Sequence, residues 1–245
     1  VLLDSLETAV KKHHPKMLYI IPTFQNPTGR TLAADRREPI AKMAEKYGFL
    51  VIEDDPYRDL RYSGEPLPSI KEYDHSGHVV YMGSFSKIIS PGMRVGYMIA
   101  QEDIISKCAI GKQGSDLHTS NLTQAIVDLY LRRNLLVPHI AEILPAYRDK
   151  LNAMLDELAK FPEGTKYTRP EGGLFIFVTM PEGFDASAIF QEAIAHDVAY
   201  VPGTSFFPEG GHQNTLRLNF SNSTLEQIHQ GMGVLRELFA SKLKG

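Results

Sequence analysis

Two serines, a lysine and an arginine follow one apolar stretch of the chain at short spacing. Ser84, Ser86 and Lys87 come directly after it, and Arg94 lies seven residues beyond the lysine. Lysine is ordinarily a solvated surface residue, but directly after an apolar strand we expect this one to be buried. Burial favours the neutral amine, which can attack an aldehyde. Because hydroxyls and a guanidinium suit a phosphate dianion, the segment predicts an amine beside a phosphate site.

A cluster of acidic residues ends a second apolar stretch, at positions 53–55, and Tyr57 follows it. Three acids after a strand can bind magnesium in an NTPase, but that function needs a G-x-x-x-x-G-K-[ST] loop, which the sequence lacks. Two interpretations stay open. The cluster is either a solvated acidic turn, or it supplies a carboxylate for a pyridinium nitrogen while the tyrosine hydroxyl binds a phenolic oxygen of the same ring.

Asn26-Pro27-Thr28-Gly29 is a third polar segment after an apolar stretch. Taken alone it is best interpreted as a turn, because Asn-Pro and Thr-Gly are common turn dipeptides. Its position matters more than its composition. In open α/β sheets, ligands bind at the carboxyl ends of the strands, and all three polar segments stand at such ends.

The elements that must position these segments alternate in type along the first half of the chain. We expect strands at residues 17–23, 49–55, 78–85 and 94–100 and a helix at 33–47. This alternation predicts an α/β fold with a mostly parallel sheet and helices on both faces. Helical patterns fill 101–160. An α+β part follows, with strands at 172–180, 198–202 and 214–220, a helix at 185–196 and a last helix at 224–243, for which Ser223 is the predicted N-cap.

The three segments together resemble the class I/II aminotransferases of the pyridoxal-5′-phosphate (PLP) type I fold. The resemblance rests on Asn-Pro-x-Gly, Asp-x-x-Tyr and Ser-x-Ser-Lys, in this order, with an arginine seven residues after the lysine. The segments TFQNPTGR, EDDPYRDLRY, SFSKIISPGMRVGY, KQGSDLHTS and NTLRLNFS look closest to the bacterial 2-aminoadipate and multi-substrate branch. The resemblance covers essentially the whole chain. It implies the C-terminal portion of the large PLP-binding domain at 1–135 and a small domain at 136–245.

The resemblance implies a role for each residue that holds the cofactor ring. Lys87 would hold PLP as a Schiff base and later carry the proton between the substrate Cα and the cofactor. Asp54 would keep the ring nitrogen protonated, and it is preferred to Asp55 because only Asp54 has Tyr57 at the family spacing. Asn26 and Tyr57 would bind the ring's phenolic oxygen, and Asn26 would also face the substrate.

The same resemblance implies how phosphate and substrate are bound. Ser84, Ser86 and Arg94 would bind the cofactor phosphate, and Arg217 would clamp the substrate carboxylate through a bidentate pair. The alternative for Arg217 is a strand arginine that faces solvent. Phe206 and its neighbour Phe207 are better interpreted as core packing than as substrate contacts.

The resemblance implies an enzyme that exchanges an amino group between an amino acid and a 2-oxo acid through PLP, and that works as a homodimer. Two alternatives stay open: a PLP β-lyase on the same scaffold, and the PLP-binding effector domain of an aminotransferase-like transcription regulator. Family members carry a further stretch before the position of residue 1. We therefore expect an N-terminally truncated chain that is inactive as an isolated fragment.

The composition limits the other functions. Lys and Arg number 26 against 29 Asp and Glu, without a basic stripe, which argues against nucleic acid as a partner. No apolar run reaches the roughly 20 residues of a membrane span. The nine histidines lack metal-ligand spacing, so no metal site is expected. The single cysteine, Cys108, favours a reducing, cytoplasmic location.

Overall fold

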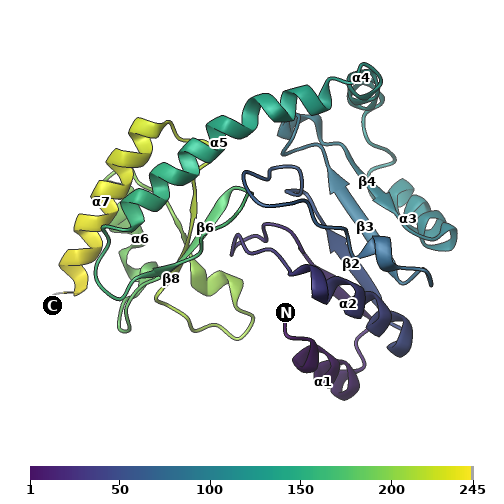
Figure 1. Cartoon of the computed structure of the whole chain (residues 1–245), viewed down its shortest axis with the longest axis horizontal. Coiled ribbons are helices and arrows are strands. Elements are labelled where there is room, and N and C mark those ends of the chain that lie inside the picture. Colours follow the sequence, from purple (N-terminus) through teal and green to yellow (C-terminus); the bar gives the residue numbers. More distant parts are fainter. Residues whose placement is uncertain (244–245) are drawn as a thin grey trace. The chain divides into compact units, whose positions relative to one another are not determined.

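The computed structural model describes residues 1–243, and the chain forms two compact units (Figure 1). Unit 1 consists of Val1–Thr23 and Thr31–Glu142. Unit 2 consists of Phe24–Arg30 and the chain from Ile143 onward. The division falls inside one helix, α5 (Leu136–Leu158). The domain boundary expected near residue 135 stays a prediction.

Unit 1 is an α/β layer built on a mixed sheet. Its elements in chain order are α1 (Leu3–His13), β1 (Met17–Ile20), α2 (Ala34–Tyr47), β2 (Leu50–Asp54), η1 (Lys71–Tyr73), β3 (Val79–Ser84), η2 (Pro91–Met93), β4 (Gly96–Ile99), α3 (Glu102–Ser115) and α4 (Asn121–Arg132). The strands lie in the order β1-β2-β3-β4, with the first three parallel and β4 antiparallel to β3. Because β1, β2 and β3 are parallel, their carboxyl ends meet at one edge of the sheet.

One face of this sheet packs against α1 and α2. Val51 and Val79, which are register partners, are fully buried there, as is Ile40 of α2. Full burial of such side chains contributes about 1.5–3 kcal/mol each. Burial alternates along β2, so successive side chains point to opposite faces. This alternation decides which acidic residue faces which environment.

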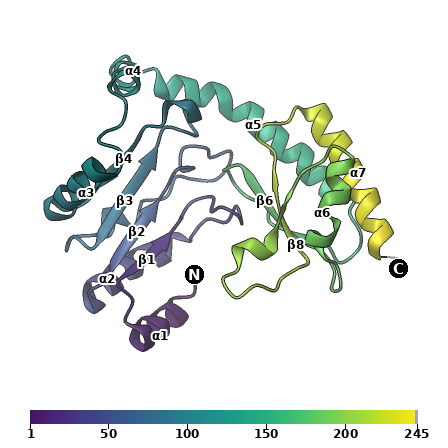
Figure 2. The same cartoon turned by 180° about the vertical axis from the view of Figure 1, so that it is seen from behind.

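Unit 2 is an antiparallel sheet with helices. Its elements are the C-terminal part of α5, β5 (Lys166–Tyr167), β6 (Phe175–Thr179), α6 (Ala186–Ala195), β7 (Val201–Pro202), η3 (Gly203–Phe206), β8 (Thr215–Asn219) and α7 (Leu225–Leu243), with strand order β5-β6-β8-β7. The helices α6 and α7 lie on one side of β6 and β8 in both views (Figures 1 and 2). Phe239 of α7 is fully buried, with its ring 4.8 Å from Phe184 and 5.7 Å from Tyr200.

The predicted N-cap of the last helix is wrong by one residue. Thr224, not Ser223, caps α7: its hydroxyl accepts from the Gln227 N–H at 3.2 Å. The Gln227 side chain accepts from the Thr224 N–H at 2.9 Å in return. This reciprocal pair is a capping box. Ser223 also stands three residues before a possible capping-box partner, Glu226, so the spacing alone does not choose between the two adjacent residues.

The α/β fold class predicted from the sequence is confirmed, and each predicted strand is present in shorter form. The two-residue strand β5 and the 3₁₀ helices η1, η2 and η3 were not predicted. Over residues 1–243, no helix is both long and apolar enough to cross a bilayer.

Candidate active site

The lysine segment forms a tight turn where β3 ends. Ser84 is the last residue of β3, and its hydroxyl accepts from the Ser86 N–H at 3.1 Å. The Phe85 carbonyl accepts from the Ile89 N–H at 2.8 Å, which closes the turn around Lys87. The expectation that Lys87 is buried is only partly met, because the turn leaves its side chain half-buried.

Arg94 lies just before the antiparallel strand β4, at the same edge of the sheet. Gly96, two residues after Arg94, is the register partner of Ser84. Arg94 has a left-handed backbone, with φ 53° and ψ 38°. Such a conformation costs a non-glycine residue on the order of 1 kcal/mol or more, and it persists where the surroundings fix it, often at functional sites. The arginine is exposed, and Nη1 donates to the Pro91 carbonyl at 3.3 Å.

Asp54 ends β2 on the face of the sheet opposite to the α2 core. Its register partner on β3 is Met82, two residues before Ser84, so the carboxylate and the lysine turn share one sheet edge. The Tyr19 hydroxyl of β1 donates to Asp54 Oδ2 at 2.5 Å. Tyr57, three residues beyond Asp54, is buried, with 6% of its surface exposed.

Asp55 points to the other face and is buried, with 4% of its surface exposed. Its carboxylate accepts a long hydrogen bond from Thr23 at 3.5 Å, and Arg58 lies 3.8 Å away. Burial, followed by the nearby charge of Glu53, raises the pKa of Asp55 to about 7. Among the described residues, Oδ1 of Asp55 has no hydrogen-bond partner. This environment keeps the Asp55 carboxyl protonated up to a much higher pH than usual and sets Asp55 apart from its neighbour.

A buried arginine and a buried glutamate complete the charged layer behind the sheet. Arg37 of α2 is fully buried and donates to the carbonyls of Pro22, Leu32 and Pro68. Glu53 is fully buried too, and accepts from two backbone N–H groups, at residues 70 and 71, both at 2.8 Å. Burial raises the pKa of Glu53, and those two bonds oppose the shift. No local pattern indicates this layer, because Arg37 lies in a helix whose neighbouring positions are polar.

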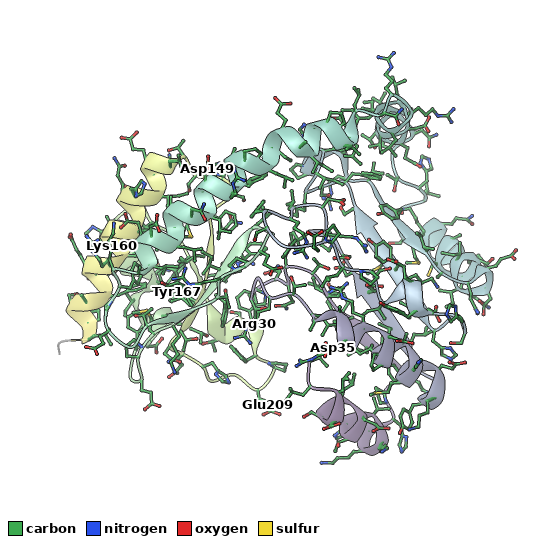
Figure 3. All side chains as sticks on the ribbon, viewed as in Figure 1. Arg30, Asp35, Asp149, Lys160, Tyr167 and Glu209 are labelled. Carbon is green, nitrogen blue, oxygen red and sulfur yellow. The ribbon has the colours of Figure 1, made fainter. Side chains whose placement is uncertain are left out.

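Asn26 lies in a loop, residues 24–30, that belongs to unit 2. The Gln25 side chain ties the loop together by accepting from the Thr28 N–H at 3.0 Å. Arg30, labelled in Figure 3, ends the loop, and its carbonyl accepts from the Gln25 N–H at 2.9 Å. The Asn26–Pro27 peptide bond is cis. The turn predicted for this segment is therefore present, and it is held by its own side chains.

Two glycines let the loop approach β6. Gly29 has φ 66°, and a Cβ there would lie 2.5 Å from the Phe175 carbonyl oxygen. Gly173 has φ 76°, and a Cβ there would lie 2.5 Å from Cβ of Phe24. Any other residue at either position meets both a disfavoured backbone and an atomic overlap.

Arg217 of β8 meets Asn26 within unit 2. Its Nη1 donates to Asn26 Oδ1 at 2.8 Å, although the two residues are 191 apart in sequence. The guanidinium lies 4.4 Å from the Phe175 ring centroid and 5.5 Å from that of Phe206. Arg217 is half-buried, and the choice between a carboxylate clamp and a strand arginine that faces solvent stays a prediction. The sequence analysis did not assign Phe206 to this contact.

The predicted residues therefore fall into two groups. Asp54, Tyr57 and the segment from Ser84 to Arg94 lie at one sheet edge of unit 1, and Asn26 and Arg217 are hydrogen-bonded in unit 2. Tyr19 was missed, because only the register of β1 on β2 places its hydroxyl at Asp54. A search of residues 1–243 finds no group of three or more His, Cys, Asp or Glu side chains arranged to hold a metal.

Comparison with known proteins identifies the family. The profile described as Aminotransferase class I and II matches residues 1–235. The chain belongs to the class I and II aminotransferase family. The family resemblance predicted from the sequence is thereby confirmed.

Individual aminotransferases match almost all of this chain. Aromatic-amino-acid aminotransferase 1 of Thermococcus litoralis is 43% identical over 243 residues, which are 99% of this chain and 58% of the relative. The 2-aminoadipate transaminase of Thermus thermophilus is 40% identical over 94% of this chain and 59% of its own length. A solved Pyrococcus horikoshii kynurenine aminotransferase, in complex with PMP, matches with TM-score 0.94 and 42% identity over 99% of this chain and 61% of that chain. The chain thus spans about three fifths of these aminotransferases.

Proposed function

We propose that this protein is a PLP-dependent aminotransferase that transfers an amino group between an amino acid and a 2-oxo acid. When bound, PLP supplies an aldehyde that condenses with amines and a ring that withdraws electrons. In this proposal Lys87 holds the cofactor and moves the proton between the substrate Cα and the cofactor carbon.

The observation that carries the proposal is the shared sheet edge of unit 1. The lysine turn follows β3, Asp54 ends the neighbouring strand, and Arg94 lies two residues before Gly96 of β4, the register partner of Ser84. The chemistry of this donor set fits PLP. Two hydroxyls and a guanidinium suit the phosphate, an ionised Asp54 suits a protonated ring nitrogen, and Tyr57 can bind the ring's phenolic oxygen.

The arginine of unit 2 supports a substrate with a carboxylate. Arg217 is held from one side by Asn26 and lies over the faces of two phenylalanine rings. A guanidinium fixed in this way loses little conformational freedom when it forms a bidentate pair with a carboxylate. We propose that it clamps the α-carboxylate, and that Asn26 also reaches the phenolic oxygen of the cofactor.

The relatives' names point to large amino acids as substrates, since they include aromatic amino acids, 2-aminoadipate and kynurenine. We propose a substrate of this size. The rings of Phe175 and Phe206 beside Arg217 support it, because they offer apolar surface next to the proposed carboxylate clamp. A β-lyase or a regulator is less well supported, because these most similar relatives are aminotransferases.

We also propose a cytoplasmic homodimer. The single cysteine supports a reducing compartment. Exposed apolar side chains on α3 and α4 support a further covering surface such as a second copy, among them Ile110, Leu122 and Leu129.

Borohydride trapping tests the assignment of Lys87. The complete protein is loaded with PLP, reduced and digested, and the modified peptide is identified by mass spectrometry. We expect the cofactor on Lys87, and Lys87→Arg should abolish covalent attachment. Lys107→Arg, on exposed α3, is the matched control and should keep the attachment. Recovery of the adduct on another lysine of the wild-type protein would refute the assignment. An amino acid-dependent conversion of a 2-oxo acid, assayed on the same preparation, tests the activity.

A further inference from the structure

The proposed function leaves Tyr19, which lies at this sheet edge, without a role. Its hydroxyl donates to Asp54 Oδ2 at 2.5 Å. The contact follows from register: Tyr19 pairs with Ile52 in the parallel ladder, and Asp54 stands two residues beyond Ile52 on the same face. The phenol therefore reaches along the sheet toward the carboxyl ends of the strands, where the lysine turn lies.

The bond is of a strong type. An O–H donor to an ionised carboxylate typically gives a distance of about 2.5–2.7 Å and is roughly twice as strong as a neutral pair. Partial burial of the phenol and the hydrogen bond to Asp54 both raise the pKa of Tyr19 above its ordinary value. Tyr19 therefore stays a neutral donor at physiological pH.

Both partners stand on hydrogen-bonded strands, not on loops. Tyr19 lies within β1 and Asp54 is the last residue of β2. Side chains fixed on strands hold a binding group in place more accurately than side chains on loops. A donor on Oδ2 also limits the rotation of the carboxylate, which leaves Oδ1 for a second partner.

We propose that Tyr19 is a positioning residue for Asp54. Its hydroxyl fixes the carboxylate through Oδ2, so that Oδ1 is presented to the protonated ring nitrogen of PLP. This inference rests on the proposed function, because it takes Asp54 as the partner of that nitrogen.

The test compares two cofactors on the complete protein, with affinity as the readout. One is PLP, and the other is the PLP analogue in which carbon replaces the ring nitrogen. Both are titrated into apoprotein and followed by absorbance or protein fluorescence. Tyr19→Phe should weaken PLP binding about tenfold, as expected for the loss of a hydrogen bond to a charged group. The same variant should bind the analogue within about twofold of the wild-type affinity, because the ring of the analogue has no nitrogen that Asp54 could contact.

Tyr47→Phe is the matched control. The Tyr47 hydroxyl donates to Glu7 at 2.5 Å, so it makes the same kind of phenol–carboxylate bond on α2, away from the site. This variant should leave both affinities unchanged. Tyr19 is 57% exposed and phenylalanine keeps the ring, so the Tyr19→Phe protein should remain folded.

Asp54→Ala distinguishes a wrong assignment of Asp54 from a wrong role for Tyr19. The wild type should prefer PLP over the analogue, and this variant should lose that preference. If Asp54→Ala keeps the preference, the assignment of Asp54 in the proposed function is wrong and the role of Tyr19 is wrong with it. If Asp54→Ala loses the preference while Tyr19→Phe keeps it in full, only the role of Tyr19 is overturned. An equal loss of affinity for both cofactors in Tyr19→Phe would show a merely structural contact and would also overturn it.

Discussion

The two faces of β2 carry charge in different ways. On one face Asp54 is half-buried and held by a single phenol from the neighbouring strand. On the other face Glu53 and Asp55 are buried near Arg37, and backbone groups supply the partners of Glu53 and of Arg37. Adjacent carboxylates thus differ because a strand turns each side chain to the opposite side. The acidic residues at 53–55 therefore form two groups, one half-buried and bonded to Tyr19 and the other buried near Arg37.

The largest effect should come from breaking the buried layer. Arg37→Met removes a cation that serves three carbonyls and lies near two buried acids. We expect a loss of about 3–5 kcal/mol in the free energy of unfolding, because uncompensated buried charges remain. Urea denaturation measures it. The control is Arg36→Met on the same helix, where the side chain is only half-buried and the loss should stay below about 1 kcal/mol. Equal losses of unfolding free energy at both positions would show that the buried charged layer makes no specific contribution to stability.

The next effect should separate the two neighbouring aspartates by activity. Asp54→Asn should lower kcat/KM about 100- to 1,000-fold, the usual cost of one electrostatic contact to the reacting system. Asp55→Asn, matched in size and chemistry, should keep kcat/KM within about threefold. Steady-state transamination on both variants measures the difference. The opposite order of effects would reverse the assignment.

A substitution of Arg217 in unit 2 tests whether this charged residue matters for activity as Asp54 is expected to. Arg217→Leu should lower kcat/KM by a factor that corresponds to a loss of about 2–4 kcal/mol in transition-state stabilisation, because the substrate carboxylate loses a bidentate partner. PLP affinity should survive, since this residue is assigned to the substrate. Arg169→Leu is the control, as Arg169 also lies over an aromatic ring of unit 2, at 5.1 Å from Tyr167. Near-normal kcat/KM in Arg217→Leu would exclude the clamp.

The smallest effect concerns the pH dependence of stability. Burial raises the pKa of Asp55 from 3.8 to about 7, so at intermediate pH the folded protein keeps a proton there that the unfolded chain has released. Stability from this group is therefore full below about pH 4 and is lost as pH rises to about 7. Asp55→Asn should remove this slope, so the variant should gain stability relative to wild type as the pH rises across the interval. Thermal or urea unfolding at a series of pH values measures it, and parallel curves for the two proteins would contradict the prediction.

The sequence predicted the elements well, since apolar periodicity and length mark them locally. The strand expected at 49–55 is β2 at Leu50–Asp54, and the helix at 185–196 is α6 at Ala186–Ala195. Short elements were not predicted. The two residues of β5, for example, are too few to show a periodic pattern of apolar side chains. Strands were also expected to run longer, as at 17–23, where pairing stops at Ile20.

The residues at the candidate site were predictable in type but not in contact. The motif spacing singled out Asp54 and Lys87 as candidates, and their assigned roles stay predictions. The bond from Tyr19 depends on the register of two strands, which no local pattern contains. The expected burial of Lys87 was only partly met, because the tight turn after β3 keeps its side chain near the surface. The pair of Asn26 and Arg217 joins positions 191 apart, beyond the reach of any local pattern.

The loop at residues 24–30 has a consequence for how the chain is made. It belongs to unit 2, yet it is synthesised well before the strands β6 and β8 that receive it. At 5–20 residues per second, the ribosome reaches Arg217 roughly ten to forty seconds after Asn26, which lies 191 residues earlier. Through that interval Phe24, fully buried in the finished protein, has no place to pack. Unit 2 therefore folds late, and closing so long a stretch of chain is the slow, non-local kind of step that leaves a nascent protein open to aggregation or chaperone binding.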